Sequence, residues 1–172
     1  MHSFETAKEI IIDMIQMGVL EPSTATYRSP LVIVKKKNGK NRMCIDFRLL
    51  NEATVSNLHP ILTVQETWNI WLKCKIWSVM DLSSAFWQIP LHENSRDVTT
   101  IWLNSMGSWR HKVVPMGART SPAALQSLAD RLFGDLKANI CAVYLDDIIS
   151  GAATVDVMME NLKLIFERLK IG

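Results

Sequence analysis

The sequence predicts an α+β fold made of antiparallel hairpins and amphipathic helices. Two hairpin patterns carry this prediction: one turns at Asn38-Gly39 and the other at residues 104–108. Apolar side chains at helical spacing near both ends of the chain supply the helices. Hairpins interleaved with helices favour α+β over a doubly wound parallel sheet, and 172 residues suit one domain or one lobe of a larger protein.

The first half of the chain is predicted to hold two helices, a hairpin and a buried strand. Helical spacing predicts a helix over Phe4–Gly18, which the glycine ends. Leu31–Lys37 and Lys40–Asp46 flank the Asn-Gly turn and are expected to pair. Thr63-Val-Gln-Glu66 fits a capping box at the start of a helix. Ile76–Met80 is a short apolar run, which indicates a buried strand.

The second half of the chain repeats the mixture of hairpins and helices. Ser121-Pro122 places a capping serine before a proline at the first helical position, which marks a helix start. The elements expected here are a short helix at Ser83–Trp87, paired strands at Val98–Leu103 and Trp109–Val114, a helix from Ser121 to about Leu136, strands at Ile140–Leu145 and Ile148–Ile149, and an amphipathic helix over Val155–Leu169.

Composition excludes several classes of protein. Apolar residues make up 48% of the chain, with 7 Gly and 6 Pro, which excludes a disordered or collagen-like chain. No apolar run reaches the ~18–20 residues of a membrane span, and the start lacks a secretory signal. Three cysteines without disulfide or zinc spacing indicate a reducing compartment. The net charge of +2 alone does not indicate a nucleic-acid partner.

Acidic residues end or interrupt apolar strands at two places. Asp146-Asp147 lies inside the apolar stretch Ala142–Ile149, and Asp81 follows Ile76–Met80. Taken singly, the adjacent pair is explained by a hairpin turn and Asp81 by a helix N-cap. Together, the two strand ends resemble a two-metal phosphoryl-transfer site, in which Mg²⁺ offsets the repulsion between carboxylates. Both interpretations stay open at this point.

Basic residues are concentrated in the first hairpin. Seven of the 19 Lys and Arg residues lie within residues 28–48, against one acid. A two-residue Asn-Gly turn would place Lys37 opposite Lys40 and Lys35 opposite Arg42, and directly opposed like charges destabilise a sheet. A lysine-rich edge that aids solubility is one explanation. The other is an anion held against the hairpin, either a triphosphate or a nucleic-acid backbone.

A set of short motifs occurs along the chain in order. They are Arg28-Ser-Pro-Leu-Val-Ile-Val-Lys-Lys-Lys-Asn-Gly39, Cys44-Ile-Asp-Phe-Arg-Leu-Leu-Asn51, Leu58-His-Pro-Ile61, Trp77-Ser-Val-Met-Asp-Leu-Ser-Ser-Ala-Phe-Trp-Gln-Ile89, Val114-Pro-Met-Gly117, Ser121-Pro122 and Tyr144-Leu-Asp-Asp147. In this order and spacing the chain resembles the fingers and palm of a reverse transcriptase from a gypsy-type LTR retrotransposon. The resemblance extends from Glu9 to Leu169.

The resemblance implies roles for the acids. Asp81, Asp146 and Asp147 match the three catalytic carboxylates of the family. Asp81 and Asp146 would hold two Mg²⁺ ions, with the Leu82 carbonyl as a further ligand. Asp147 would lie beside the primer terminus. The other residues expected at the primer terminus are Tyr144 and Leu145.

The resemblance also implies which residues bind the incoming nucleotide. Lys35 and Arg42 match the fingertip positions that grip the triphosphate. Phe86 matches the aromatic position beneath the sugar that excludes a 2′-hydroxyl, although without the flanking motif it would be interpreted as core packing. Met116 lies where the family usually has Phe. The remaining nucleotide-binding residues are expected to be Ser83, Ser84 and Ala85.

The chain departs from the family pattern near the nucleotide pocket. Arg119 is an unexpected charge in the stretch Met116–Pro122, Val113 replaces a residue that is commonly basic, and Ser150 follows the paired acids one apolar residue early. The three acids are intact. The thumb, connection and RNase H regions of the family are expected to lie beyond Gly172, and no protease or integrase pattern is present.

The expected structure is a right-hand polymerase palm, an antiparallel sheet backed by helices, with a fingers subdomain and no thumb. Fingers are expected at about 1–75 and 88–114, and palm at about 76–87 and 115–172. The implied function is RNA-directed DNA synthesis from a primer 3′-hydroxyl and dNTPs on an RNA or DNA template, with no membrane partner. We expect it in a cytoplasmic retroelement particle or the nucleus, within a longer Pol polyprotein. A non-catalytic nucleic-acid-binding remnant of a retroelement is the alternative, and a two-metal nuclease is a third.

Overall fold

The computed structural model describes residues 2–35, 41–56, 59, 71–72, 74–104, 106–137 and 139–171. The chain forms two compact units from interleaved segments: unit 1 has residues 1–56 and 86–121, and unit 2 has residues 57–85 and 122–172. The expected fingers and palm also interleave, but with boundaries at about 75, 87 and 114. The assignment of fingers and palm to these segments stays a prediction.

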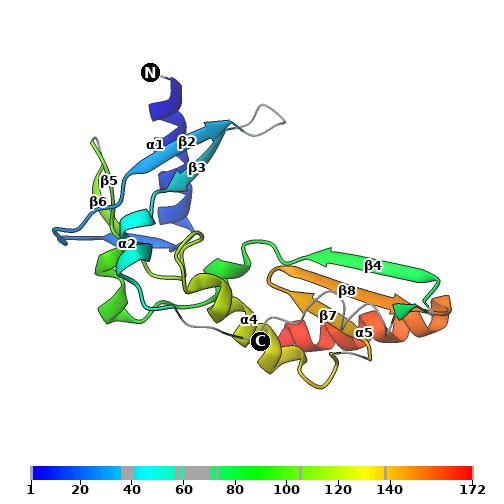
Figure 1. Cartoon of the computed structure of the whole chain (residues 1–172). Helices are drawn as coiled ribbons and strands as arrows, with labels where there is room; N and C mark the ends of the chain where they lie inside the picture. Colours follow the sequence, from blue (N-terminus) through cyan, green and yellow to red (C-terminus); the bar gives the residue numbers. More distant parts are fainter. Residues whose placement is uncertain are drawn as a thin grey trace. The chain divides into compact units, whose positions relative to one another are not determined.

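Unit 1 is built around a helix and two small antiparallel sheets. Helix α1 (His2–Gln16) buries Ala7, Ile11 and Met14 along one face, and Gly18 follows its end with a φ of 71°. The sheets have the strand orders β1–β6–β5 and β2–β3. Hairpin β2–β3 lies beside α1 (Figure 1), and its side chains Leu31, Ile33, Met43 and Ile45 pack against the core cluster that includes Ile11. The other elements of this part are β1 Leu20–Pro22, β2 Leu31–Lys35, β3 Asn41–Ile45, α2 Arg48–Ala53, η2 Glu93–Ser95, η3 Asp97–Thr99, β5 Ile101–Leu103 and β6 Gly107–His111, and the short helix η1 Ala85–Gln88 begins at the last residue of a unit 2 segment.

The register of hairpin β2–β3 differs from the expected one. Lys35 lies opposite Asn41 and Val34 lies opposite Arg42, so Lys35 and Arg42 do not form a cross-strand pair. The predicted pairing of Lys35 with Arg42 is therefore wrong, because a one-residue change of register changes every cross-strand pair. The loop itself, residues 36–40, lies outside the described residues. Opposed like charges at Lys35 and Arg42 therefore give no support to anion binding.

The second hairpin forms as predicted, but both of its strands have other bounds. Its strands β5 and β6 are antiparallel; β5 begins at Ile101 instead of Val98, and β6 covers Gly107–His111 instead of Trp109–Val114. Thr99 and Thr100 donate their hydroxyls to the carbonyls of Arg96 and Asp97, each at 2.7 Å. Such local side-chain bonds stabilise a 3₁₀ turn in place of an extended strand.

Unit 2 is a three-stranded antiparallel sheet with helices on one face. The strand order is β4–β8–β7 (Figure 1). A buried cluster that includes Phe133, Ile148 and Ile165 joins the helices to the sheet. The element bounds are β4 Ile76–Asp81, α4 Ser121–Phe133, β7 Cys141–Tyr144, β8 Asp147–Ala152 and α5 Val155–Ile171. The predicted α+β class is confirmed, whereas the helix predicted from Thr63 lies outside the described residues. Among the helices described, none combines the length and apolar character of a membrane span.

His111 is a buried histidine in unit 1. It is 1% exposed, and its Nδ1 donates to the Thr99 carbonyl at 3.1 Å. Its ring meets the Phe47 ring edge-to-face at 6.3 Å between centroids. Burial lowers the pKa of His111 to about 4, although the hydrogen bond to Thr99 opposes this shift. The imidazole is therefore neutral in the folded chain at neutral pH.

We expect the folded chain to lose stability between about pH 6.5 and pH 4. The unfolded chain binds a proton at His111 in this window and the folded chain does not, so stability falls as pH falls, by about 3 kcal/mol from this residue. Chemical denaturation across the window measures the slope. His111→Gln retains a donor for Thr99 but does not titrate, so its profile should be flatter. An unchanged slope in that variant would show that His111 is not the cause.

Candidate active site

Two of the expected catalytic acids lie opposite each other at one end of the sheet in unit 2. The register pairs Asp81 of β4 with Asp147 of β8, and the same Asp147 pairs with Tyr144 of β7. Side chains alternate between the two faces of a strand, and all three of these residues are exposed. They therefore form a row across three strands, on the face that the helices leave uncovered.

Asp146 occupies the turn between β7 and β8. Leu145 and Asp146 form a two-residue loop, in which Leu145 has a φ of 56°. The Asp146 carbonyl accepts a hydrogen bond of 2.7 Å from the Leu82 backbone N–H, which connects this turn to the end of β4. The structure thus brings all three acids to one end of one sheet, although Asp81 is far from the other two in sequence.

The oxygen donors at this end of the sheet fit a magnesium site that substrate would complete. Among the described residues, no group of three or more His, Cys, Asp or Glu side chains is arranged to hold a metal by itself. Mg²⁺ usually takes only one or two carboxylates and fills its other positions with water and substrate phosphates. The Leu82 carbonyl accepts a bond of 3.2 Å from the Ala85 N–H, and its second lone pair can face a cation. Asp81, Asp146 and Leu82 would together supply hard oxygen ligands of the kind that Mg²⁺ prefers.

The expected nucleotide-binding residues belong to both units. Phe86, which is half-buried, and Met116, which is exposed, belong to unit 1. Lys35 and Arg42 also belong to unit 1, but their side chains lie outside the described part of the structure. The residues of this set in unit 2 are Ser83, Ser84, whose φ is 55°, and the buried Ala85. Their shared role stays a prediction.

Asn51 and Gln126 hold loops near the predicted site residues, and sequence analysis gave neither a role. Asn51 donates Nδ2 to the Gly117 carbonyl at 3.0 Å and accepts the Arg119 N–H at 2.8 Å, which fixes the loop after Met116. The Arg119 guanidinium donates to the Asn51 carbonyl at 3.3 Å. Gln126 is 1% exposed and bonds the turn between β7 and β8. A polar side chain at a core position of an amphipathic helix was the available signal for Gln126.

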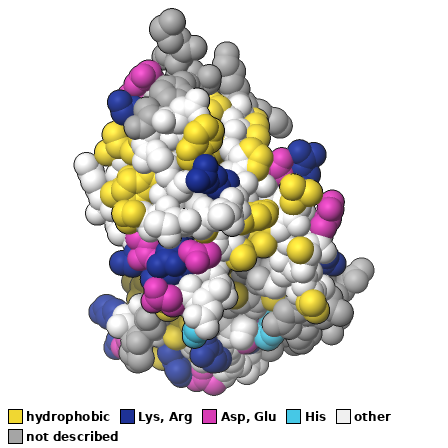
Figure 2. Space-filling model, turned by 90° about the vertical axis from the view of Figure 1, so that its left-hand side faces the viewer, with side chains coloured by type: hydrophobic (Ala, Val, Ile, Leu, Met, Phe, Trp, Pro, Cys, Tyr) yellow, Lys and Arg dark blue, Asp and Glu magenta, His cyan; other side chains and the backbone are white. Residues whose placement is uncertain are grey.

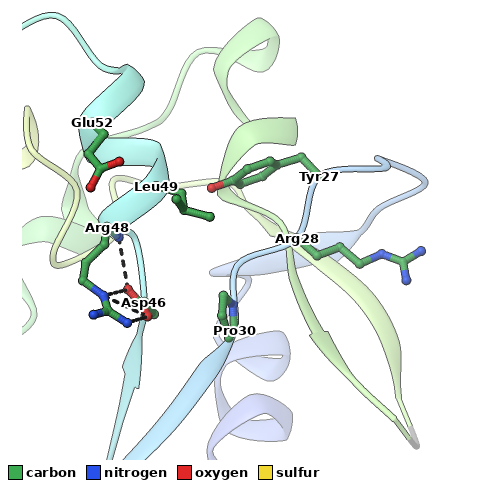
Figure 3. A pocket seen from close by; sticks show the side chains of 7 residues that line it. All are labelled: Tyr27, Arg28, Pro30, Asp46, Arg48, Leu49 and Glu52. Carbon is green, nitrogen blue, oxygen red and sulfur yellow. Dashed lines mark hydrogen bonds and ion pairs between the residues drawn. The ribbon is translucent and has the colours of Figure 1, made fainter.

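A pocket of about 420 Å³ lies in unit 1 (Figure 3). The Arg48 guanidinium binds both carboxylate oxygens of Asp46 at 2.6–3.1 Å, and these bonds lower the pKa of Asp46 to about 2. Arg28 extends away from this pair (Figure 3). Because Asp46 neutralises Arg48, the pocket has no preformed preference for anions. It is lined by Tyr27, Arg28, Pro30, Asp46, Arg48, Leu49 and Glu52.

Several arginines outside the first hairpin bind acids within their own unit. Arg110 binds Glu21 and Asp97, each at 2.8 Å, and Arg168 binds Asp135. Outside residues 28–48 the chain has 12 basic and 16 acidic residues. On the face shown in Figure 2, Lys and Arg side chains lie interspersed with Asp and Glu. These charges offer few contacts to a nucleic-acid backbone, which proteins bind mainly through Lys and Arg.

Comparison with known proteins identifies the family. The pattern of the family described as "Reverse transcriptase (RNA-dependent DNA polymerase)" matches residues 34–171. This match covers well over half of the chain, so the chain belongs to the reverse transcriptase family.

Relatives come from transposons and plant viruses. The chain is 31% identical over 173 residues to the Retrovirus-related Pol polyprotein from transposon 297 of Drosophila melanogaster, covering 98% of the chain and 16% of that polyprotein. It is 32% identical over 142 residues to the polyprotein from transposon gypsy of the same species, covering 79% and 14%. With the Enzymatic polyprotein of Cauliflower mosaic virus (strain Strasbourg) the identity is 30% over 143 residues, covering 81% and 21%. The chain thus spans 14–21% of the length of these relatives.

Solved reverse transcriptases share the fold. A foamy viral protease-reverse transcriptase in complex with RNA/DNA hybrid matches with a TM-score of 0.87 and 24% identity, covering 98% of this chain and 22% of that one. A foamy viral protease-reverse transcriptase dRH in complex with ds DNA matches with a TM-score of 0.83 and 26% identity, covering 95% and 28%. The predicted combination of palm and fingers is confirmed as the fold of the chain.

Replacing Asp147 should stabilise the chain when no divalent cation is present. Like charges directly opposite each other in a sheet cost a few tenths to about 1 kcal/mol, and Asp147→Asn removes one of the pair with Asp81. Thermal or chemical unfolding in EDTA, at low and high salt, measures the gain, which should shrink as salt rises. The control is Asp156→Asn in the first turn of α5, which should lose a favourable interaction with the helix dipole. If Asp147→Asn lost as much unfolding stability as Asp156→Asn, the proposed repulsion between Asp81 and Asp147 would be contradicted.

Proposed function

We propose that this chain carries the nucleotidyl-transfer centre of an RNA-directed DNA polymerase. In that reaction the 3′-hydroxyl of a primer attacks the α-phosphate of a dNTP, and pyrophosphate leaves. The observation that carries the proposal is the meeting of Asp81, Asp146 and Asp147 at one end of the β4–β8–β7 sheet. Membership of the reverse transcriptase family supports the same reaction.

The acids would serve two purposes. Asp81 and Asp146, with the Leu82 carbonyl, would hold two Mg²⁺ ions, and Asp147 would lie beside the primer terminus with Tyr144 and Leu145. When bound, the ions supply positive charge that lowers the pKa of the attacking hydroxyl and stabilises the leaving oxygen. The chain itself orients these carboxylates through the cross-strand register and the hydrogen bond from Leu82 to Asp146.

The nucleotide-binding roles are proposed from the family motifs, residue by residue. Lys35 and Arg42 would contact its triphosphate with charge-assisted hydrogen bonds, for which Arg and Lys are well suited. Phe86 would lie beneath the sugar and Met116 against the nucleotide. The residues proposed to lie along the nucleotide after β4 are Ser83, Ser84 and Ala85. Family motifs support these roles.

The proposed partner is a primer annealed to an RNA or DNA template. The related foamy viral structures are complexes with RNA/DNA hybrid or with ds DNA. Outside residues 28–48 the chain has 12 basic against 16 acidic residues, so we expect weak, salt-sensitive binding by residues 1–172 alone, because duplex affinity depends on many phosphate contacts. We further propose that the chain acts in a retroelement particle in the cytoplasm or in the nucleus, joined to other Pol regions.

Asp146→Asn should abolish primer extension by the full 172-residue chain. Single-nucleotide addition to a labelled primer, with Mg²⁺ and low salt, should be slow in the native chain and at least about 100-fold slower in the variant, because one electrostatic group at a reacting centre commonly contributes that much. The control Asp156→Asn changes an exposed acid of the same unit and should retain the native rate. Template–primer binding without any addition would favour the non-catalytic remnant, and Mg²⁺-dependent strand cleavage would favour a nuclease.

A further inference from the structure

The turn that carries Asp146 has a strained backbone. Leu145 has a φ of 56°, which non-glycine residues rarely adopt. In a two-residue hairpin loop with positive φ only at the first position, that position is usually glycine. A leucine at this position needs other interactions to hold the loop in this conformation. Because Asp146 is the next residue, the same interactions determine where Asp146 lies.

The side chain of Gln126 supplies those interactions from helix α4. Its Oε1 accepts the backbone N–H of Leu145 at 3.0 Å, and its Nε2 donates to the Val143 carbonyl at 3.1 Å. The side chain is 1% exposed, so water does not compete for these bonds. One amide therefore joins the end of strand β7, at Val143, to the first loop residue, Leu145.

Asp130 determines which way the Gln126 amide faces. It lies one helical turn further along α4, and its Oδ1 accepts the second Nε2 hydrogen of Gln126 at 3.0 Å. A carboxylate only accepts, so the amide nitrogen must face Asp130 and the amide oxygen must face Leu145. Burial alone would raise the pKa of Asp130, but hydrogen bonds from Lys137, His59 and Gln126 outweigh it and hold that pKa below its ordinary value. The acceptor is therefore ionised at neutral pH.

We propose that Gln126, oriented by Asp130, is a positioning residue that holds Leu145 in its left-handed conformation and thereby sets the place of the Asp146 carboxylate. This inference rests on the proposed function, since it gives the held turn a purpose in binding the metal ions. The network consists of Gln126, Asp130, Lys137 and His59 in unit 2.

The test uses NMR on the full 172-residue chain, with Mn²⁺ as the probe in place of Mg²⁺. Gln126→Leu keeps the side-chain volume but removes the amide. In this variant the Leu145 N–H should exchange its hydrogen with solvent about tenfold faster, because the loss of one hydrogen bond changes an equilibrium by roughly that factor. The Mn²⁺ concentration that broadens the signals of Asp81, Asp146 and Asp147 should rise about tenfold or more, as when the support of a metal ligand is removed. The control Arg131→Ala alters an exposed residue of the same helix and should change neither quantity.

A rescue variant separates positioning from general packing. Glycine adopts positive φ without a steric penalty, so Leu145→Gly added to Gln126→Leu should restore most of the Mn²⁺ affinity while amide exchange at position 145 stays fast. Asp130→Asn should weaken Mn²⁺ binding in the same direction, and it serves as the readout if Gln126→Leu does not fold.

Two results would overturn the inference alone: Leu145 exchange in Gln126→Leu equal to that of the native chain, or equal Mn²⁺ affinities in the single and double variants. If Mn²⁺ broadened the NMR signals of none of the three acids in the native chain, the proposed metal site itself would be overturned. Because amide exchange needs no metal, the two failures are distinguishable.

Discussion

Three carboxylates held at one end of an antiparallel sheet form the constraint on which unit 2 depends. Asp81 and Asp147 are cross-strand partners, and Asp146 is the neighbour of Asp147. Opposed like charges cost up to about 1 kcal/mol, whereas burying one Ile or Phe side chain contributes about 1.5–3 kcal/mol. Ile148 and Ile165, with 0% exposure, lie among the buried residues that join the sheet to its helices. The apolar core therefore outweighs the repulsion and fixes the acids where water or a cation can reach them.

Backbone strain is located at the same end of the sheet. Ser84 and Leu145 are the non-glycine residues with positive φ in the described part of the chain, and each lies within three residues of a proposed metal ligand. Strained conformations of this kind persist only where the surroundings determine them, and they concentrate at functional sites. For Leu145 the surroundings are the buried Gln126 and the hydrogen bonds that orient it. The strained conformation of Leu145 thus lowers the stability of the fold, and the bonds of Gln126 offset this cost while they hold the turn that carries Asp146.

Local patterns in the sequence predicted most of the elements, and the features that were missed either left no local pattern or depend on long-range contacts. Helices at both ends, both hairpins and the strands that carry the acids follow from the spacing of apolar residues and from turn residues. Helix α2 has six residues and no side-chain cap, so it left no pattern to detect. The register of β2–β3 depends on loop geometry, which the Asn-Gly pair alone does not determine. The family motifs indicated Asp81, Asp146 and Asp147, but the bonds made by Gln126 join residues that only the fold brings together.

The most direct test of the proposed active centre is the separation of the Asp81 and Asp146 carboxylates in a crystal structure of the chain with Mn²⁺ and a non-hydrolysable dNTP. We predict that both carboxylates and the Leu82 carbonyl contact one pair of ions, visible as anomalous peaks at the end of the β4–β8–β7 sheet. Ions in such pairs lie ~3.5–4 Å apart, so carboxylates more than about 8 Å apart, or the absence of peaks at this end of the sheet, would contradict the proposal.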